Sequence, residues 1–441
     1  MSYLYRFFSI KKMYNLILNT EYNNENEILN LKQELINNGS LFIKLGQYIS
    51  QNPNKIKIFT KNEIDTNLIT KILSPLQNNT PIYDKNHIKN KLEYHNIENI
   101  IIDEPIGSGS IAQVYKTKDE KKAIKILHPK VVEDLETDIS IIKSIKWCLN
   151  WFNKTIDILD IDQFMENLKN QCNLLNESHY TDVFSKNFEK YPKERIFFPK
   201  IFFKKKDLII EEYIDGLHLN DFKLKYPHLN IICKIKTMAA LIQMILIDGI
   251  MHSDCHNGNI LYKLNEKKME IYFIDCGIVS VFSEDIKNGI IKFISGISNK
   301  DTDLLIEGVQ KVMKNKALLN KEEIDQIGNI MAKPGFGSEK IKLLTDYFIN
   351  NNLKLEINFL NAMINLVLIS QDENYVENYN ADLFDIVFMY IVELSTYNEL
   401  STLVKNIFMY DVISKKKGIV IAKIIKDIKN GDGELLKSIK K

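Results

Sequence analysis

The stretch from Gly249 to Gly277, GIMHSDCHNGNILYKLNEKKMEIYFIDCG, constrains the fold of this chain more than any other. It contains a His-x-Asp-x-x-x-x-Asn pattern, formed by His252, Asp254 and Asn259, and an Asp-x-Gly pattern that begins at Asp275. Alone, a His-x-Asp sequence usually marks only a turn. A predicted β-hairpin between the two patterns makes their combination specific. The spacing is typical of a phosphoryl-transfer site, where one Asp faces the acceptor and an Asn and a second Asp hold Mg²⁺ against nucleotide phosphates.

The side chains in this stretch have chemistries that suit these roles. Asp254 would accept the hydroxyl proton of the acceptor or orient the acceptor, because phosphoryl transfer depends mainly on positioning. Asn259 and Asp275 offer the amide and carboxylate oxygens that suit Mg²⁺ as a hard cation. His256 occupies the place where protein kinases carry a lysine against the transferred phosphate. We expect a pH-sensitive contact there, because histidine titrates near neutral pH.

A lysine and a glutamate far upstream fit the nucleotide end of such a site. Lys125 lies in the strand-like run AIKIL and would hold the α- and β-phosphates while paired with a carboxylate. Glu177 lies within a predicted helix, on the face expected to meet the strands, and is the best candidate for that carboxylate. A surface lysine on a strand and a solvated helix glutamate are the alternatives if the two residues are taken alone.

Small residues from Gly107 to Ser110 form the first turn of a predicted antiparallel meander. Gly107, Ser108, Gly109 and Ser110 lack bulk, so their backbone N–H groups can approach phosphates closely, although the run alone indicates only a hairpin turn. Glu212 and Ile214, where a later predicted strand ends, complete the predicted nucleotide-binding residues. Lys44 and Gln47, one turn apart on a predicted helix, have no chemical assignment from spacing alone and fit a polar helix face.

The composition describes a globular chain rather than a disordered or fibrous one. Its 441 residues leave room for two or three lobes, and 45% of them are hydrophobic and 26% charged. With 58 basic and 57 acidic residues, the net charge of +1 gives no field that favours nucleic acid. The five dispersed cysteines indicate reduced thiols in an intracellular compartment.

We expect no transmembrane span, because no uninterrupted apolar stretch reaches the length of about 18 residues that a span requires. The apolar run from Met238 to Met251 is interrupted by Gln243 and Asp248 and predicts a buried helix. The first twenty residues contain Arg6 and two lysines but no acid. They predict an ordinary first helix, with an organelle-targeting or membrane-surface helix as the alternative, so the protein is expected to be soluble or peripheral to a membrane.

The hydrophobic patterns predict an α+β chain in three parts. Residues 1–97 form a helical extension, residues 98–215 a small β-rich lobe, and residues 216–441 a helical lobe. In the middle part we expect a helix over 131–152 and a second one over 161–188. The second is apolar on two sides, which predicts that it packs between the strands and the N-terminal helices. Two further strands are expected over 196–203 and 208–214.

Several of these motifs together resemble the UbiB/ADCK family of atypical kinases, also called aarF-domain-containing kinases. The resemblance covers roughly residues 30–315. Its specific parts are Lys44-Leu45-Gly46-Gln47, similar to the family's Lys-x-Gly-Gln, and Ser110-Ile111-Ala112-Gln113-Val114. The Ala-Ile-Lys strand, Asn176-Glu177-Ser178, the His252–Asn259 loop and Asp275-Cys276-Gly277 also match, but the loop pattern occurs in aminoglycoside- and choline-kinase-like enzymes too.

The resemblance implies a two-lobed protein-kinase-like fold that binds ATP with Mg²⁺. It further implies that the helical extension folds over the acceptor side of the site, which makes Lys44 and Gln47 expected active-site occupants. Members of the family are linked to isoprenoid-quinone and lipid metabolism at membranes. An ATPase or a small-molecule kinase is therefore favoured over a protein kinase.

Four departures from the family pattern put substrate and nucleotide preference in doubt. Gln171-Cys172-Asn173 replaces an acidic Glu-x-Asp, and Gly107-Ser108-Gly109 replaces an alanine-rich loop. Glu211 stands where a Met-like residue borders the adenine pocket, and Cys255 and Asn257 replace two prolines. The phosphate and metal ligands remain, so nucleotide binding is expected to survive.

Three functions remain open from the sequence. The first is an ATP- and Mg²⁺-dependent kinase or ATPase acting on a small-molecule, lipid-related or water acceptor. The second is a nucleotide-gated binding module with little turnover. The third is a serine/threonine protein kinase or an aminoglycoside- or choline-kinase-like enzyme. In the aminoglycoside- or choline-kinase-like case, Lys44 and Gln47 would have no role.

Overall fold

The fold is known from a computed structural model of the chain. The structure describes residues 3–51, 53, 56, 63–77, 80, 82–97, 100, 102–119, 121–151, 161–256, 258–266, 268–314, 317–334, 337–351, 353–370 and 383–407. These residues belong to two compact units. Unit 1 comprises residues 1–179 and 200–213, and unit 2 comprises residues 180–199 and 214–441. The N-terminal helices that we predicted as an extension therefore share one unit with the strands that follow them.

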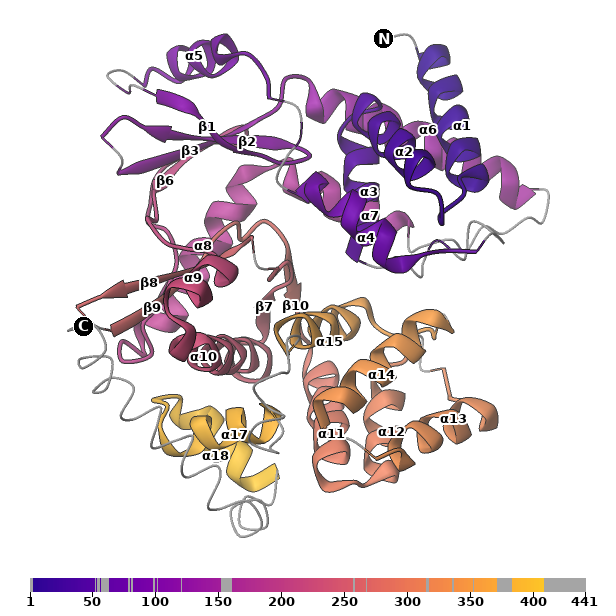
Figure 1. The fold of residues 1–441 in the computed structure, drawn as a ribbon, viewed down its shortest axis with the longest axis vertical. Coiled ribbons are helices and arrows are strands. Elements are labelled where there is room, and N and C mark those ends of the chain that lie inside the picture. Colours follow the sequence, from indigo (N-terminus) through magenta and orange to yellow (C-terminus); the bar gives the residue numbers. More distant parts are fainter. Residues whose placement is uncertain are drawn as a thin grey trace. The chain divides into compact units, whose positions relative to one another are not determined.

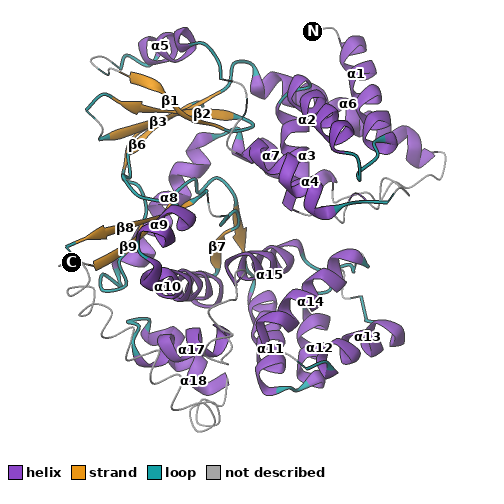
Figure 2. Ribbon diagram, in the orientation of Figure 1, coloured by secondary structure: helices purple, strands orange, loops and turns teal. Residues whose placement is uncertain are grey.

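Unit 1 combines helices with one antiparallel sheet (Figures 1 and 2). Among the described residues, five strands form this sheet in the order β1-β2-β3-β6-β5. The strands are β1 (Ile102–Ser108), β2 (Ala112–Thr117), β3 (Lys122–Leu127), β5 (Ile201–Lys204) and β6 (Leu208–Glu212). The helices are α1 (Tyr3–Asn19), α2 (Glu25–Asn37), α3 (Ser40–Gln51), α4 (Thr66–Leu73), η2 (Ser74–Gln77), α5 (Lys85–Tyr94), α6 (Val131–Trp151), α7 (Ile161–Gln171) and the start of α8 (Leu174–Glu189).

Unit 2 is mostly helical, with short strands near its start. Its strands are β4 (Ile196–Phe197), β7 (Ile250–His252), β8 (Ile260–Asn265), β9 (Lys268–Phe273) and β10 (Val279–Val281). Its helices are α9 (Leu219–Lys225), η3 (Pro227–Leu229), α10 (Asn230–Gln243), η4 (Met244–Asp248), α11 (Glu284–Asn299), α12 (Thr302–Lys311), α13 (Lys321–Ala332), α14 (Gly337–Asn350), α15 (Ile357–Ser370), α17 (Leu383–Glu393) and α18 (Asn398–Ile407). The predicted α+β class is confirmed.

Two predicted elements are wrong, because each is broken into two in the structure. The strand expected over 196–203 is split at Pro199, which has no backbone N–H to donate. Its first part, β4, pairs with β9 in unit 2, and its second part, β5, pairs with β6 in unit 1. The helix expected over 161–188 is broken at Cys172 and Asn173 into α7 and α8.

The second half of α8 packs differently from our expectation. Phe184 and Phe188 do not meet the strands of unit 1 but lie in the core of unit 2. The ring of Phe184 stacks on Phe198 at 5.4 Å, and Phe198 stacks on Phe273 at 5.7 Å. The two apolar sides of the predicted helix therefore serve two different cores, with Leu168, Cys172 and Leu174 in a core of unit 1.

Helix α10 and the π-helical turn η4 that continues it pass through the core of unit 2. Together they cover residues 230–248, the one helix among the described residues that is apolar and long enough to cross a membrane by length and composition. Of its most apolar stretch, 72% is buried inside the protein. The buried helix predicted for the run from Met238 to Met251 is therefore present as far as Asp248, whereas Met251 lies in β7.

Helices α11 and α12 approach each other closely through glycines. A Cβ atom on Gly308 would lie 2.5 Å from the backbone nitrogen of Phe293 and 2.7 Å from the carbonyl oxygen of Gly289. A Cβ atom on Gly296 would lie 2.5 Å from the backbone nitrogen of Leu305. Because these neighbours are backbone atoms, they cannot move aside without separating the helices.

The Gly308→Ala variant is therefore expected to destabilise the protein by about 1–3 kcal/mol through overpacking. Gly328→Ala, within α13, is the matched control, because a Cβ atom there meets nothing within 4 Å. The control should be neutral or more stable by up to about 1 kcal/mol, since alanine favours a helix over glycine. Urea unfolding followed by far-UV circular dichroism measures both variants, and equal midpoints would refute the close-packing argument.

Candidate phosphoryl-transfer site

The β3 lysine and the α8 glutamate form a buried ion pair in unit 1. Lys125 lies in β3, in register with Val114 of β2 and Ile209 of β6. Its Nζ lies 2.8 Å from each carboxylate oxygen of Glu177. The two residues are only 8% and 4% exposed. Buried charges are costly unless they are paired, so each residue holds the other in its charged form.

The break between α7 and α8 places Glu177 in the first turn of α8. The break is fixed by the Leu174 N–H, which donates to Lys206 O at 2.9 Å, and by the Leu175 N–H, which donates to Asn173 Oδ1 at 3.3 Å. Gln171 Nε2 donates to Asn167 O at 3.3 Å. Gln171 and Asn173, which replace two acids of the family pattern, thus make local hydrogen bonds around the break.

The small-residue loop between β1 and β2 is held by two side chains from outside it. The Gly109 N–H closes the turn onto Ala112 O at 2.9 Å. The Gly109 carbonyl accepts hydrogen bonds from Thr80 Oγ1 at 2.6 Å and from His128 Nε2 at 2.9 Å. Thr80 Oγ1 also lies 2.9 Å from Ser108 Oγ. The predicted phosphate loop is therefore held in place by hydrogen bonds from two other residues of unit 1 to the Gly109 carbonyl.

His128 was not among the residues we predicted. Since a carbonyl can only accept, its contact with Gly109 requires the proton on Nε2. Burial lowers the pKa of His128, which favours this neutral ring. The ring also lies against Tyr83, with centroids 4.7 Å apart. The sequence signal was slight, a histidine directly after a strand, at a position where histidine usually has no special role.

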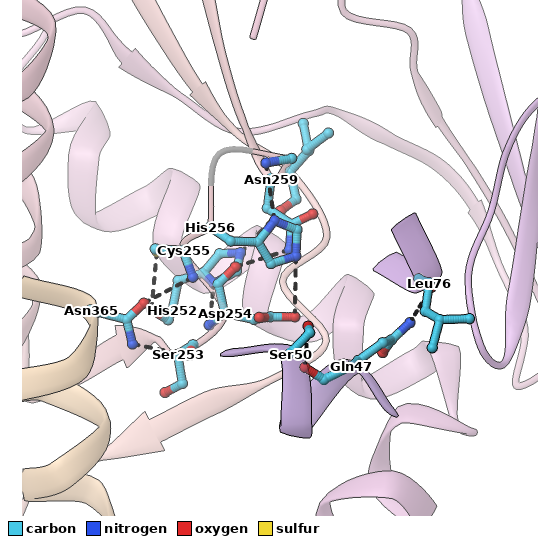
Figure 3. Close-up of polar contacts among 12 residues, drawn as sticks. Gln47, Ser50, Leu76, His252, Ser253, Asp254, Cys255, His256, Asn259 and Asn365 are labelled. Atoms are coloured by element: carbon cyan, nitrogen blue, oxygen red, sulfur yellow. Dashed lines mark hydrogen bonds and ion pairs between the residues drawn. The ribbon is translucent and has the colours of Figure 1, made fainter. Parts of the chain in front are cut away.

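In unit 2, a buried histidine orders the loop that carries Asp254 (Figure 3). His252 is fully buried, and its Nε2 donates to Ile274 O at 3.0 Å. Its Nδ1 accepts from the Asp254 N–H at 3.2 Å. This pair of contacts requires the neutral ring, and burial lowers the pKa of His252 in the same direction. His252 thereby joins the backbone of Asp254 to the residue that precedes Asp275.

The two predicted metal ligands lie at the same end of the β8–β9 hairpin. Ile260 and Phe273 are register partners, and just beyond them the Ile274 N–H donates to Asn259 O at 2.9 Å. Asn259 Nδ2 donates to Asp254 O at 2.9 Å, so the amide presents its Oδ1 as the remaining ligand atom. The side chain of Asn259 thus fits a cation that takes oxygen ligands.

Asp275, the other predicted ligand, is exposed and has a φ of +58°. This is the left-handed region, which Asp and Asn tolerate better than most residues. No group of three or more His, Cys, Asp or Glu side chains with the arrangement of a metal site occurs within the described part of the chain. A Mg²⁺ site of the kinase kind does not need one, because the ion keeps waters and takes substrate phosphate oxygens.

His256 lies beside Asp254, as its place in the motif suggests. Its Nε2 is 3.7 Å from Asp254 Oδ2, and its Nδ1 accepts from the Gly258 N–H at 3.0 Å. Asn257, between these residues, lies outside the described residues. Asp254 and His256 are thus held close enough to act on one group.

Lys44 and Gln47 lie on α3, in unit 1. Gln47 is 7% exposed, and its Nε2 donates to Leu76 O at 2.8 Å (Figure 3). A Cβ atom on Gly46 would lie 2.6 Å from Leu76 Cδ1, so α3 packs tightly on η2. Gln47 therefore has a structural contact within its own unit, while Lys44 is half-buried. Their predicted place on the acceptor side stays a prediction.

Glu212 and Ile214 lie where the chain passes from unit 1 to unit 2. Glu212 ends β6, and its N–H donates to Lys200 O at 2.9 Å. Ile214 is buried, and its carbonyl accepts from the Gly216 N–H at 3.0 Å. Their predicted contact with a nucleotide base stays a prediction.

Comparison with known proteins identifies the family. The profile of the ABC1 atypical kinase-like domain matches residues 77–309, more than half of the chain. The chain therefore belongs to this family, and the predicted protein-kinase-like fold and UbiB/ADCK-type membership are confirmed.

Individual matches are more distant. The probable serine/threonine-protein kinase abkC of Dictyostelium discoideum is 30% identical over an alignment of 246 residues, and the match covers 52% of this chain and 34% of abkC. The mitochondrial ABC1 family protein YPL109C of Saccharomyces cerevisiae is 28% identical over an alignment of 262 residues, and the match covers 51% of this chain and 38% of that protein. The matched regions span about one third to two thirds of the curated relatives.

Among solved structures, the complex of Rv3197 with erythromycin from Mycobacterium tuberculosis matches with a TM-score of 0.46 at 17% identity. The match covers 66% of this chain and 83% of that one.

Proposed function

We propose that this protein binds ATP with Mg²⁺ and transfers the γ-phosphoryl group to a small-molecule, lipid-related or water acceptor. The observation that carries the proposal is the buried contact of Lys125 Nζ with both oxygens of Glu177, at 2.8 Å each. In kinases this ion pair must be in place for the lysine to hold the nucleotide phosphates. Membership of an atypical kinase family supports the same chemistry.

The predicted site residues would divide the work between holding the metal, activating the acceptor and selecting the acceptor. Bound Mg²⁺-ATP would supply the phosphoryl group and the cation that neutralises its charge. Asn259 Oδ1 and the Asp275 carboxylate are the atoms that would hold the cation. Asp254 would orient the acceptor and take its proton, with its backbone fixed by His252 and Asn259. Lys44 and Gln47 would restrict which acceptors reach Asp254.

The second candidate is a binding module that responds to the nucleotide with little turnover. It is favoured by the phosphate loop, whose Gly109 carbonyl is held by both Thr80 and His128. A loop fixed in this way adapts less easily to the changing geometry of a transferred phosphate.

For either candidate function we also propose a location in an organelle, since one relative is named as mitochondrial.

ATP turnover and thermal shift, measured for the wild type and for Asp254→Asn, separate the two candidates. The variant should lower phosphate release or transfer from radiolabelled ATP by about 100-fold or more, because a positioned acid–base group contributes that much. Its thermal shift with Mg²⁺-ATP should match that of the wild type. Asp325→Asn, an exposed change on α13, is the matched control and should leave turnover unaffected. A wild-type protein that is stabilised by Mg²⁺-ATP but releases no phosphate would refute the enzyme and support the binding module.

A further inference from the structure

A stripe of asparagines interrupts the otherwise apolar helix α15. Asn358, Asn361 and Asn365 are spaced by three and four residues, which places them on one face of the helix. Asn358 Nδ2 donates to Val281 O at 2.7 Å, and Asn361 Nδ2 lies 3.2 Å from Ser280 Oγ. This face of α15 therefore contacts β10, the strand that follows Asp275.

Asn365, at the end of the stripe, contacts the loop that carries Asp254 (Figure 3). Its Oδ1 accepts from the Cys255 N–H at 3.0 Å, and its Nδ2 donates to Ser253 O at 3.0 Å. The same Nδ2 donates to Asn361 O at 2.8 Å. Asn365 is 2% exposed, so its side-chain amide is buried with both of its hydrogens and its oxygen bonded.

These bonds complete a set around the backbone of Asp254. Ser253 O and Cys255 N, on either side of it, both bond to Asn365. The Asp254 N–H bonds to His252, and the Asp254 carbonyl accepts from Asn259. Side chains, rather than a strand or helix, thus satisfy four consecutive backbone groups. Since a buried polar backbone group is costly to leave unpaired, this arrangement fixes the peptides on both sides of Asp254.

We propose that Asn365 is a positioning residue for Asp254, so that α15 belongs to the functional site although it lies beyond the family match at residues 77–309. The inference rests on the proposed function, in which Asp254 orients the acceptor. Asn365 touches no reacting atom. It acts by fixing the backbone from which the Asp254 side chain projects. A misplacement of a catalytic group by about 1 Å can lower a rate by about 100-fold.

The Asn365→Leu variant tests this, since leucine has a similar size and makes no hydrogen bonds. We expect the kcat for ATP turnover to fall by about 100-fold, with the KM for Mg²⁺-ATP little changed. Asn358→Leu is the matched control, because it removes one bond of the same stripe and leaves the Asp254 loop untouched. Wild-type kcat in Asn365→Leu, or an equal fall in both variants, would overturn the proposal.

Hydrogen exchange gives a second readout that needs no turnover. The amide of Cys255 should exchange faster in Asn365→Leu than in the wild type, and at the wild-type rate in Asn358→Leu. Unchanged exchange in Asn365→Leu would overturn the proposal even if turnover fell. A wild-type protein without turnover would overturn the proposed function instead, while faster exchange at Cys255 would still support Asn365 as the residue that fixes this loop.

Discussion

Replacing Lys125 with methionine is expected to destabilise the protein by about 3–5 kcal/mol and to abolish its thermal shift with Mg²⁺-ATP. The first effect follows from the Glu177 carboxylate, which is 4% exposed and would lose the ammonium group at 2.8 Å. Breaking a buried pair by removing one partner costs this much because the other charge stays buried and uncompensated. The second effect follows from the loss of the positive charge proposed to bind the phosphates.

A double variant separates these two effects. Lys125→Met with Glu177→Leu removes both charges, and replacing a whole buried pair by apolar residues is often neutral. We expect the double variant to recover most of the lost stability in urea unfolding and still to show no shift with Mg²⁺-ATP. Lys122→Met, on the same strand, is the control. If the double variant responds to the nucleotide as the wild type does, the ion pair is only structural.

The Asp275→Asn variant is expected to lower ATP turnover by about 100-fold or more. A bound metal ion contributes several kcal/mol to stabilising charge in the transition state, and each 1.4 kcal/mol is about tenfold in rate. The substitution should leave the backbone conformation unchanged, because asparagine tolerates a φ near the observed +58° as well as aspartate does. The carboxylate charge is lost while the backbone is kept.

Magnesium titration distinguishes loss of the metal from loss of the fold. With Asp275→Asn, the Mg²⁺ concentration that gives half-maximal thermal stabilisation by ATP should rise, whereas the melting temperature without ligand should match the wild type. Asp285→Asn, exposed at the start of α11, is the matched control. An unchanged Mg²⁺ requirement would show that Asp275 does not hold the ion.

Local patterns predicted the parts of the site that lie on regular elements. The period-2 run around Lys125 placed it in β3, and the helical pattern placed Glu177 within reach of it, as the 2.8 Å contacts show. The predicted hairpin between the two motifs likewise placed Asn259 and Asp275 at one end of β8 and β9. In these cases the local sequence pattern determines the strand or helix on which a side chain lies, and hence its place in the site.

Non-local contacts account for what the sequence did not predict. Pro199 sits within an apolar, strand-like run, and only the two sheets show that the run divides there between β4 and β5. The break at Asn173 likewise depends on a bond from Leu174 to the distant Lys206. Propensity alone favours continuing both elements, because it contains no information about such partners.

Asn365 was missed although two signals for it were present. The spacing of the asparagines in INFLNAMINLVLIS indicates a polar stripe on a buried helix. Cys255 stands where the family motif has a proline, so this chain gains a backbone N–H that needs an acceptor once it is buried. Neither signal names its partner, and 110 residues separate Cys255 from Asn365.

Release or transfer of the γ-phosphate of radiolabelled ATP, measured with Mg²⁺ for the wild type and Asp275→Asn side by side, tests the central claim most directly. The wild type should turn over ATP, and Asp275→Asn should lose about 100-fold or more of that activity. Equal turnover by the two proteins, or none by the wild type, would contradict the claim that this chain is a phosphotransferase whose metal is held by Asn259 and Asp275.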